Sequence, residues 1–542
     1  MGRVRSVVSR VNSRLSIQLA AVLLSGSTLL SSFLGLYRDR LLNSMYYDTY
    51  KVGLDAYTYA FSVPDFMFII LVSGALSVTF IPVFNQRLAT GNKRSAWELS
   101  SSLINFMALV TLVVSVLIMV FAEPIVTHII APGLDESGRG LAVSMMRVIA
   151  INPFLFAIAT VIASMQQAVG RFTFYALAPT ICNIGIIFGA LFLTQPVTIF
   201  GTQVWEGGIM GVALGVVLGS IMQLIVSAIG LIGLGFDYQF KIFWRNKGFR
   251  KVLRLLPARS IDQGMDYIVG MVELRLASFM ESGVSRALQQ ATALHMMPIN
   301  LIGVAISTAV FPSLTESLGA GDKEKFRTEL QKIIRVIVWL ALPVATITFF
   351  ARGYVVSFIV NGGDPLMASL LGALVVAILF RTVYHIAARS FYAQQDTKTP
   401  LYVSIFSITL NIALAVWFTQ SLNMGAYGLA FAQSVVAFVE VVILFVIMQR
   451  HVEGGVIDKV FLHGIGRMVS ATGFMAVVTY TMVQLLQLQS TDLSLSSTLP
   501  KFMLIVAVSA IAYVAICRLM KLEETEPVIR KIRTILFSRG IK

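Results

Sequence analysis

Ionisable residues interrupt an otherwise apolar stretch at positions 258–281 of this 542-residue chain. Asp262 and Asp266 are four residues apart, and Glu273 lies seven beyond Asp266, so a helix would place all three carboxylates on one face. Arg275 follows two positions later. Such an acidic stripe can bind a cation or transfer a proton. The structural alternative is that Asp262 lies in the cytoplasmic interface and that Glu273 pairs with a neighbouring base.

Basic residues show the same helical spacing elsewhere. Arg381, His385 and Arg389 stand at intervals of four, which predicts a basic stripe facing either a cavity or the inner headgroups. Arg38 and Asp39 are adjacent at the end of the apolar run SSFLGLYRDR. They form either an interfacial ion pair or, with Arg38 in a cavity, a phosphate clamp, because a guanidinium binds phosphate oxygens in bidentate fashion.

No catalytic motif accompanies these residues. The sequence has no Walker A loop, no HExxH and no nucleophile elbow. Cys182 and Cys517 lie in apolar segments without metal-ligand spacing, which predicts free thiols and no metal site. We therefore expect a transporter rather than an enzyme, with no ATPase activity and no cofactor. A gradient of Na⁺ or H⁺, or the membrane potential, would have to drive it.

The composition places the chain in lipid. It is 57% hydrophobic and 13% charged, whereas soluble domains carry about 25% charged residues. The net charge of +15 lies in short loops between apolar runs, a pattern that orients membrane proteins and argues against nucleic-acid binding. Apolar runs of about 20 residues, long enough to span the hydrocarbon, number about fourteen and cover 16–36, 57–84, 99–121, 143–167, 174–194, 207–234, 258–281, 287–312, 332–351, 366–392, 401–420, 426–448, 466–487 and 498–519.

The loops alternate between rich and poor in Lys and Arg, which predicts a multi-pass plasma-membrane protein with both termini in the cytoplasm. The first span is expected to be an uncleaved helix rather than a signal peptide. The basic segment 1–15 before it is predicted either to lie as an amphipathic helix on anionic inner-leaflet lipids or to be a disordered tail.

The chain repeats itself. FIPVFNQRLATGNK at 80–93 is echoed by VFPSLTESLGAGDK at 310–323, and QQAVGRFTFYALAPTICNI at 166–184 by QQDTKTPLYVSIFSITLNI at 394–412. Both glycine-containing loops are predicted helix stops followed by turns. Chance similarity between apolar segments is the alternative. Because six spans separate the copies, the halves should point the same way through the membrane, and parallel repeats enclose a substrate path at their interface.

The predicted fold is therefore an all-α polytopic membrane protein. Two parallel-repeat six-helix bundles surround a central cavity, and two further helices follow at the C-terminus. The predicted parts are the basic N-terminal segment 1–15, an N-lobe 16–234, a basic cytoplasmic linker 235–257, a C-lobe 258–448, two added spans within 449–519 and a basic cytoplasmic tail 520–542.

Six short segments carry a family resemblance, and it extends over about residues 14–520. They are SSFLGLYRD (31–39), LDAYTYAFSVPD (54–65), APGL (131–134), GRFTFYALAPTICNI (170–184), GVAISTAVFPSL (303–314) and FYAQQDTKTP (391–400). They resemble the MurJ/MviN family of bacterial lipid II flippases, in the multidrug/oligosaccharidyl-lipid/polysaccharide exporter superfamily. The resemblance implies fourteen helices, two lobes and a cationic cavity. It also implies translocation of an undecaprenyl-diphosphate-linked peptidoglycan precursor to the outer leaflet by alternating access, with cell-wall synthesis proteins as partners.

The resemblance implies substrate-binding residues in the first two helices. The family's motif serine and one of its arginines fall on Ser31 and Arg38, and its acidic residue before the second helix falls on Asp55. Asp39 adjoins Arg38 and is included with them. Some family members bind sodium between helices 7, 11 and 12, but helix 11 has no acid here, so no metal site is predicted. The residues predicted to couple transport to a cation or proton are Asp262, Asp266, Glu273 and Asn411.

Three arginines of the family's cavity are missing. Their places are taken by Ser32, Phe68 and Ala293. One hypothesis is that other arginines restore the positive charge that binds diphosphate; the candidates are Arg275, Arg286 and Arg381. The alternatives are an exporter of another polyprenyl-linked glycolipid or amphipathic solute, and a non-transporting scaffold derived from a flippase. The missing arginines favour the first alternative, and the ionisable residues kept in the spans argue against the second.

Overall fold

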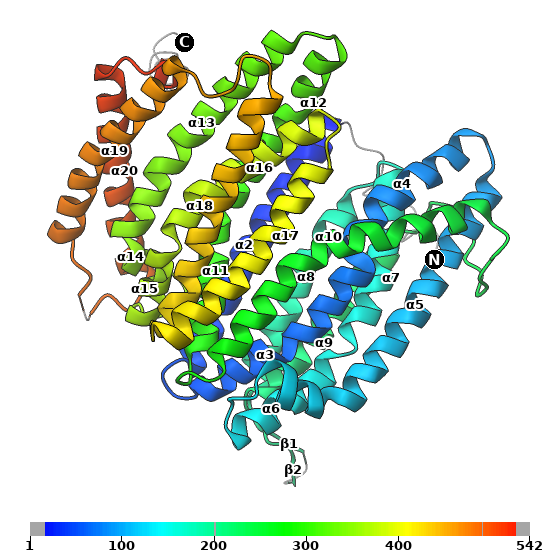
Figure 1. Cartoon of the computed structure of the whole chain (residues 1–542). Coiled ribbons are helices and arrows are strands. Elements are labelled where there is room, and N and C mark those ends of the chain that lie inside the picture. The colour runs from blue at the N-terminus through cyan, green and yellow to red at the C-terminus, as the bar shows by residue number, and fades with distance from the viewer. Residues whose placement is uncertain (1–16, 200–201, 490, 527–529, 531–542) are drawn as a thin grey trace, which may run out of the picture. The chain divides into compact units, whose positions relative to one another are not determined.

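The computed structural model describes residues 17–199, 202–489, 491–526 and 530 (Figure 1). The basic segment predicted at 1–15, and most of the tail predicted at 520–542, lie outside these residues. The chain divides into two compact units, Met1–Ser285 and Arg286–Lys542, and each has its own hydrophobic core.

The first unit is built from long helices, several of which contain or end in a π-helical turn. Its elements are α2 (Ile17–Tyr46), α3 (Lys51–Phe68), η1 (Ile69–Ser73), α4 (Gly74–Ala89), α5 (Lys93–Pro124), η2 (Ile125–Ile130), α6 (Glu136–Ile149), α7 (Asn152–Ala168), α8 (Thr173–Phe188), η3 (Gly189–Leu193), β1 (Val197–Ile199), β2 (Thr202–Trp205), α9 (Met210–Ile229) and α10 (Lys247–Ala277). Its core joins α4, α5 and α10 through buried residues that include Phe80, Phe84, Leu99, Leu103 and Phe249.

The second unit is helical throughout its described part. Its elements are α11 (Val284–Pro298), which begins just before the boundary, η4 (Ile299–Val304), α12 (Ala305–Gly319), α13 (Lys323–Phe350), α14 (Arg352–Ser357), α15 (Pro365–Ala373), α16 (Val375–Ala393), α17 (Lys398–Val416), η5 (Trp417–Ser421), α18 (Gly425–His451), α19 (Lys459–Leu485), α20 (Leu495–Leu519) and η6 (Glu523–Thr525). The two C-terminal helices pack on α13, where Trp339, Met468 and Tyr513 form a smaller core.

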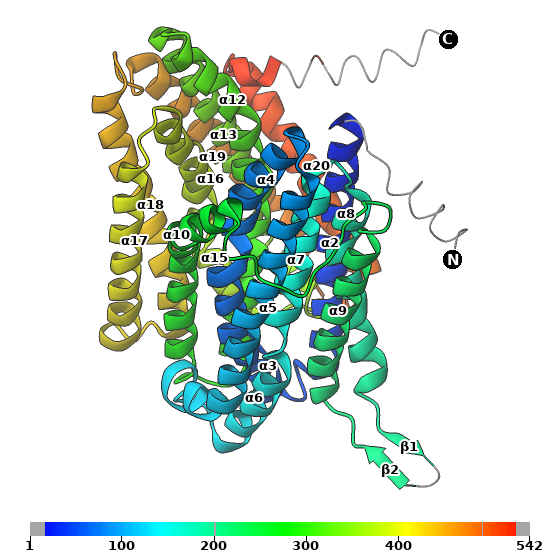
Figure 2. The same ribbon diagram turned by 90° about the vertical axis from the view of Figure 1, so that its right-hand side faces the viewer.

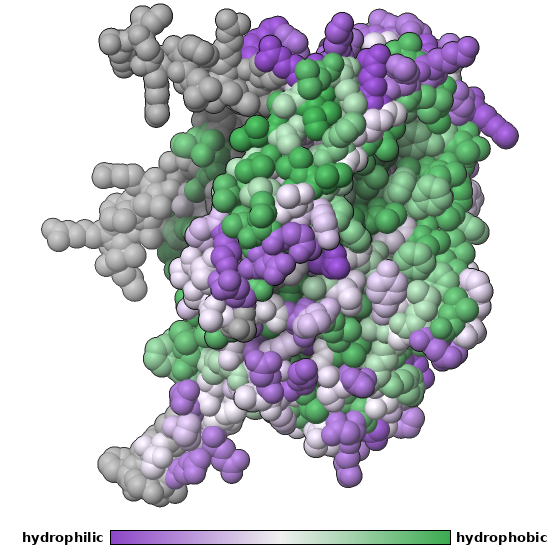
Figure 3. Space-filling model, turned by 90° about the vertical axis from the view of Figure 1, so that its left-hand side faces the viewer, coloured by the Kyte–Doolittle hydropathy of each residue, from purple (hydrophilic) through white to green (hydrophobic). Residues whose placement is uncertain are grey.

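Helices occupy every span predicted from the sequence. Within the part of the chain that the structure describes, eleven helices are long and apolar enough to cross a membrane. The number is twelve if α15 and α16, which are bent by 42° relative to each other, form one span. The two predicted spans outside this set are α2 and α10, whose 30 and 31 residues are long enough to cross. Hydrophobic residues cover much of the face in Figure 3, as a lipid-facing surface requires, and hydrophilic residues gather along its upper edge.

The sequence repeat is a structural repeat. Each glycine-containing loop is the predicted helix stop: α4 and α12 end, Gly91 and Gly321 adopt φ of 76° and 75°, and a new helix begins. Asn92 and Asp322 cap the new helices by accepting hydrogen bonds from the N–H groups three residues on, at 3.0 and 2.9 Å. The echo at a spacing of 228 residues also holds, because η3 at 189–193 and η5 at 417–421 end α8 and α17 in the same register.

A short β-hairpin departs from the all-α prediction. Strands β1 and β2 pair antiparallel between η3 and α9, and the hairpin projects beyond the helix ends (Figure 2). In the second unit the chain passes from η5 to α18 through only three residues, 422–424. The hairpin is therefore an insertion in the first half, in a loop that the sequence placed outside the bilayer.

The linker is shorter than the 235–257 predicted, because α10 begins at Lys247. Asn246 caps this helix by accepting hydrogen bonds from the N–H groups of Gly248 and Phe249, and the buried Phe249 and Val252 anchor its first turns in the first unit's core. The division between compact units therefore falls after Ser285, whereas the sequence placed α10 at the start of the C-lobe.

Candidate functional site

A polar cluster joins α2 to α8 inside the first unit. The Nδ2 of Asn183 donates hydrogen bonds to the main-chain oxygen and to the Oγ of Ser31, each at 3.2 Å. The Oδ1 of Asn183 accepts one from the Nη1 of Arg38, also at 3.2 Å. The Nη2 of Arg38 lies 3.2 Å from the Oδ1 of Asp39. Ser31, Arg38 and Asp39 therefore lie together, and Asn183 connects them; their binding of substrate stays a prediction.

Helix α3 adds charge to this cluster. Asp65 of α3 interacts electrostatically with Arg38, and Tyr57 and Cys182 do so as well. Asp65 follows Pro64 and precedes the π-helical turn η1. Pro298 precedes the π-helical η4 in the same way in the second unit. Irregular turns of this kind often occur at functional sites, and here one interrupts the span that carries Asp65.

The cluster keeps its arginine accessible. The side chains of Arg38 and Asp39 are 26% and 20% exposed, so the guanidinium is partly desolvated but open on one side. A guanidinium held by a neutral amide and one carboxylate can exchange the carboxylate for a phosphate, because both anions accept the same pair of N–H bonds. The observed geometry is an arginine–aspartate ion pair whose arginine is also held by the amide of Asn183.

Asp55 has a different set of contacts. It is 2% exposed, and its Oδ2 accepts a hydrogen bond from the N–H of Gly283, in the loop between α10 and α11. Four residues on, the hydroxyl of Tyr59 is hydrogen-bonded to that of Ser285. The first contact fastens α3 to the loop that follows α10, and the second fastens it to Ser285 at the start of α11. This gives Asp55 a structural task, and its predicted substrate contact stays a prediction.

The predicted acidic stripe lies on α10, which is continuous from Lys247 to Ala277 and so keeps Asp262, Asp266 and Glu273 at helical spacing. The side chains of Asp262 and Asp266 are outside the described part. Glu273 is buried, at 5% exposed. Arg275 donates hydrogen bonds to the main-chain oxygens of His128 and Ile129 at the end of η2, the second at 2.7 Å. Arg275 therefore stabilises a helix end, a contact that the sequence did not predict.

The second unit holds a basic cluster on α11 and α16. Arg381 interacts electrostatically with His385 and with the completely buried His295. Arg389, the third member of the predicted stripe, donates to the main-chain oxygen of Val304 at 3.4 Å. The predicted one-face spacing on α16 is thus observed.

Arg286 and Asn411 are also buried in the second unit. Arg286 is 3% exposed, and its Nη1 donates to the Oε1 of Gln289 at 3.3 Å. Asn411 is 2% exposed, and its Oδ1 accepts no hydrogen bond from the residues that the structure describes. Asn411 is the repeat counterpart of Asn183, whose equivalent oxygen accepts from Arg38. The two halves therefore differ at this position: one amide oxygen has a cationic partner, and the other is open to one.

The residues at the positions of the missing arginines are uncharged. The hydroxyl of Ser32 donates to the main-chain oxygen of Thr28 at 2.9 Å, Phe68 packs against Phe156 with ring centroids 5.4 Å apart, and Ala293 is exposed. Across the described residues, no group of three or more His, Cys, Asp and Glu side chains could hold a metal ion. Cys182 and Cys517 are free thiols, as expected.

Asn183 is the main residue that the sequence reasoning missed. The signal was present, because Asn183 and Asn411 occupy the same place, one residue before the end, in the two copies of the longer echo. A polar residue kept at the same place in both halves of an apolar repeat marks a position where a polar partner is needed. Its partner on α2 could only be identified from the packing.

Solved structures identify the fold. A lipid II flippase MurJ in an inward closed conformation superposes with a TM-score of 0.74 at 23% identity, covering 92% of this chain and 98% of that one. An inward-facing MATE family transporter of the MOP superfamily superposes with a TM-score of 0.65 at 16% identity, covering 80% and 98%. The protein therefore has the all-helical membrane fold shared by these flippases and multidrug transporters.

The family follows from the sequence. A model of the lipid II flippase MurJ family matches residues 50–503, and the chain belongs to this family. The probable lipid II flippase MurJ of Thermotoga maritima is 25% identical over 510 residues, covering 93% of this chain and 97% of that protein. The corresponding protein of Borreliella burgdorferi is 23% identical over 452 residues, covering 82% and 86%.

Proposed function

We propose that this protein moves lipid II, the undecaprenyl-diphosphate-linked precursor of peptidoglycan, from the inner to the outer leaflet of a bacterial plasma membrane. The match to the lipid II flippase family over residues 50–503 carries the proposal. The number of apolar helices supports a multi-pass membrane protein. The protein is a transporter and not an enzyme, because flipping a lipid forms and breaks no covalent bond.

Arg38 is the proposed diphosphate contact. It is partly exposed, and its charge is shared with Asp39 rather than fully neutralised by a buried partner. A diphosphate would displace Asp39 and gain the same paired N–H bonds, while Asn183 holds the guanidinium in place. Ser31 and Asn183 would then position the arginine, and Asp65 would limit how tightly the anion is held, so that it can leave.

Further positive charge is needed where the family's other arginines are missing. We assign it to Arg381 and Arg286 of the second unit, since Arg381 already belongs to a basic cluster. Arg275 is left out, because main-chain oxygens occupy its guanidinium. The transport cycle is proposed to be alternating access, with both termini cytoplasmic, a polyprenyl-diphosphate lipid as substrate and cell-wall synthesis proteins as partners.

Rescue in cells tests the function. Expression of this chain should restore growth to a bacterium depleted of its own lipid II flippase, and purified protein in vesicles should move labelled lipid II to the outer leaflet. A chain that flips another polyprenyl-linked glycolipid but not lipid II would point to the related exporter. A chain that inserts and folds but moves neither lipid would point to the scaffold.

Coupling to a cation or proton is assigned to Glu273 and Asn411, with Asp262 and Asp266 on the same helix as Glu273. Glu273 is buried on α10, and the open Oδ1 of Asn411 would accept from a protonated group or contact a cation. Glu273→Gln should abolish the response of lipid II flipping to an imposed H⁺ or Na⁺ gradient in vesicles, because the amide cannot change its charge. Glu281→Gln, at an exposed loop position, is the control and should respond normally. An unchanged response in Glu273→Gln would remove this residue from coupling.

A further inference from the structure

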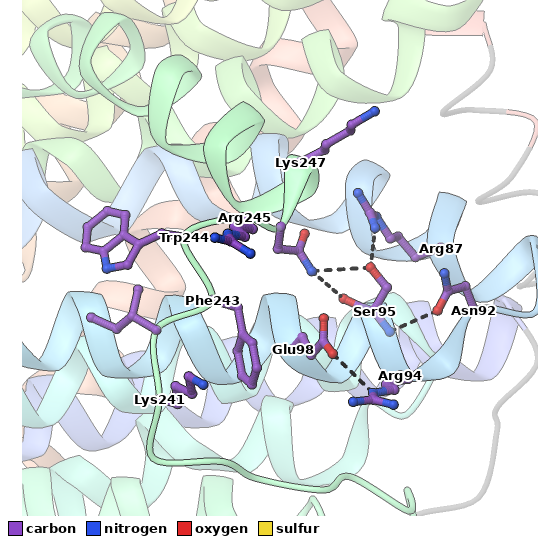
Figure 4. Close-up of a pocket in the computed structure, with 12 residues that line it drawn as sticks. Arg87, Asn92, Arg94, Ser95, Glu98, Lys241, Phe243, Trp244, Arg245 and Lys247 are labelled. Atoms are coloured by element: carbon purple, nitrogen blue, oxygen red, sulfur yellow. Dashed lines mark hydrogen bonds and ion pairs between the residues drawn. The ribbon is translucent and has the colours of Figure 1, made fainter.

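The first unit has a basic pocket of about 730 Å³ outside the polar cluster described above (Figure 4). It lies where the loop before α5 meets the linker before α10. Five basic side chains and one acidic side chain line it, together with two aromatic rings and two asparagines. The residues that matter here are Arg87, Asn92, Arg94, Ser95, Glu98, Lys241, Phe243, Trp244, Arg245, Asn246 and Lys247.

Two of the five basic side chains in the pocket already have partners within the chain. Glu98 pairs with Arg94 at 3.2 Å, and Arg87 donates a hydrogen bond to the Oγ of Ser95. Asn246 donates to the main-chain oxygen and the Oγ of Ser95, at 3.1 and 3.2 Å, and so ties the linker to the start of α5. The wall of the pocket is thus built by hydrogen bonds between segments that are distant in the sequence.

The remaining charge has no counter-ion. Among the residues that the structure describes, Arg245 and Lys247 have neither an ion pair nor a side-chain hydrogen bond, and both are exposed. Helices α5 and α10 also begin at this pocket, each with a capping asparagine. Their N-terminal dipole ends add to the positive potential of the side chains.

The repeat supplies an internal comparison. The matching helix start in the second unit, at α13, also carries basic residues, but two of them are paired within the chain. Lys323 pairs with Glu453 at 2.6 Å, and Arg327 pairs with Asp458 at 2.9 Å. Hydrogen bonds from Phe461 and Gln331, with the charge of Arg327, also hold the pKa of Asp458 below its usual range. The first unit has the same turn and the same helix start but leaves its pocket cationic.

We propose that this pocket binds a phosphate group, on an anionic lipid headgroup or on a soluble phosphate ester. The loops that form it lie on the side that the sequence predicts to be cytoplasmic, where basic pockets at helix ends meet anionic headgroups. Trp244 is exposed beside it, and an exposed tryptophan at the membrane–water boundary favours the lipid source. The bound phosphate would bridge the linker at Arg245 and Lys247 to α4 at Arg87. The site is separate from the proposed transport function, so a chain that failed to flip lipid II would still bind there.

Native mass spectrometry of the full-length protein in neutral detergent tests this site. The double variant R245A/K247A is compared with K325A/K332A, which removes two exposed lysines from the N-terminal part of α13 in the second unit. At about one kcal/mol for each basic residue, the pocket variant should bind phosphatidylglycerol about 30-fold more weakly than the wild type. The control variant should bind it as the wild type does.

A second arm distinguishes the two sources of phosphate. Inorganic pyrophosphate is added to the same three proteins, and the unfolding midpoint and the retained phosphatidylglycerol are measured. Retention of lipid that pyrophosphate does not displace assigns the site to a headgroup. Binding of pyrophosphate to the wild type and the control, with its loss in R245A/K247A, assigns it to a soluble phosphate. If R245A/K247A and K325A/K332A behave alike towards both probes, the proposal is wrong.

Discussion

A protein with Arg38→Ala is expected to insert and fold but to fail in rescuing a bacterium that lacks its own lipid II flippase. Arg38 is held by Asn183 and paired with Asp39, so its loss removes the proposed diphosphate contact together with this ion pair. Loss of a charge-assisted contact of this kind costs about 2–5 kcal/mol, which corresponds to roughly a 30-fold or greater fall in lipid II affinity. Binding of labelled lipid II to the purified protein measures this fall in affinity.

Two companion variants separate charge from geometry. Arg38→Lys keeps the charge but not the planar fork, so it should retain only part of the affinity. Arg147→Ala, which removes a half-exposed arginine 3.9 Å from Glu123, is the matched control and should rescue fully. The proposed role of Arg38 is refuted if Arg38→Ala and Arg147→Ala bind and flip lipid II equally well at equal expression.

The second large effect is expected at the contact between α8 and α9, which lie side by side in Figures 1 and 2. A Cβ atom on Gly215 would lie 2.6 Å from the Cα of Gly189, so even Gly215→Ala must push the helices apart. Small residues at a spacing of four let membrane helices approach this closely. Overpacking typically costs about 1–3 kcal/mol, which should lower the unfolding midpoint by roughly 5 °C.

The same substitution elsewhere provides the control. Gly140 lies on α6, and a Cβ atom there would meet nothing within 4 Å. Gly140→Ala should therefore leave the unfolding midpoint unchanged or raise it, because alanine is the better helix former. Since α8 also carries Asn183, Gly215→Ala should reduce lipid II binding as well. Equal midpoints for the two variants would show that the close approach does not constrain the unit.

Much of the fold could be predicted from the sequence. A lipid environment requires long apolar helices, and the two halves have matching residues at a nearly constant spacing. Helix α10 begins at Lys247, before the predicted span 258–281, because apolar periodicity does not detect a helix whose first turns are basic. The basic first turns of this helix are stabilised instead by the cap at Asn246 and by Phe249 in the core. The hairpin was missed because so short a pair of strands has no period to detect.

The site was predictable in its residue types but only partly in its contacts. Arg38 and Asp39 adjoin in the sequence, so their pairing follows from chain connectivity. The link from Arg38 through Asn183 to Ser31 depends on how α8 packs on α2. Arg275 was read as free charge for a substrate, but the open carbonyls at the end of η2 lie within its reach. The predicted central cavity and the substrate roles of Asp55, Arg275, Arg286 and Arg381 stay predictions.

The paired π-helical turns show what persisted after the two halves diverged. Residues 189–193 read GALFL and residues 417–421 read WFTQS, and no position matches, yet both ends carry the same five-residue turn. The two halves therefore keep the same main-chain conformation at this helix end although they share no residue there. At this helix end, backbone geometry preserves the repeat better than residue identity does.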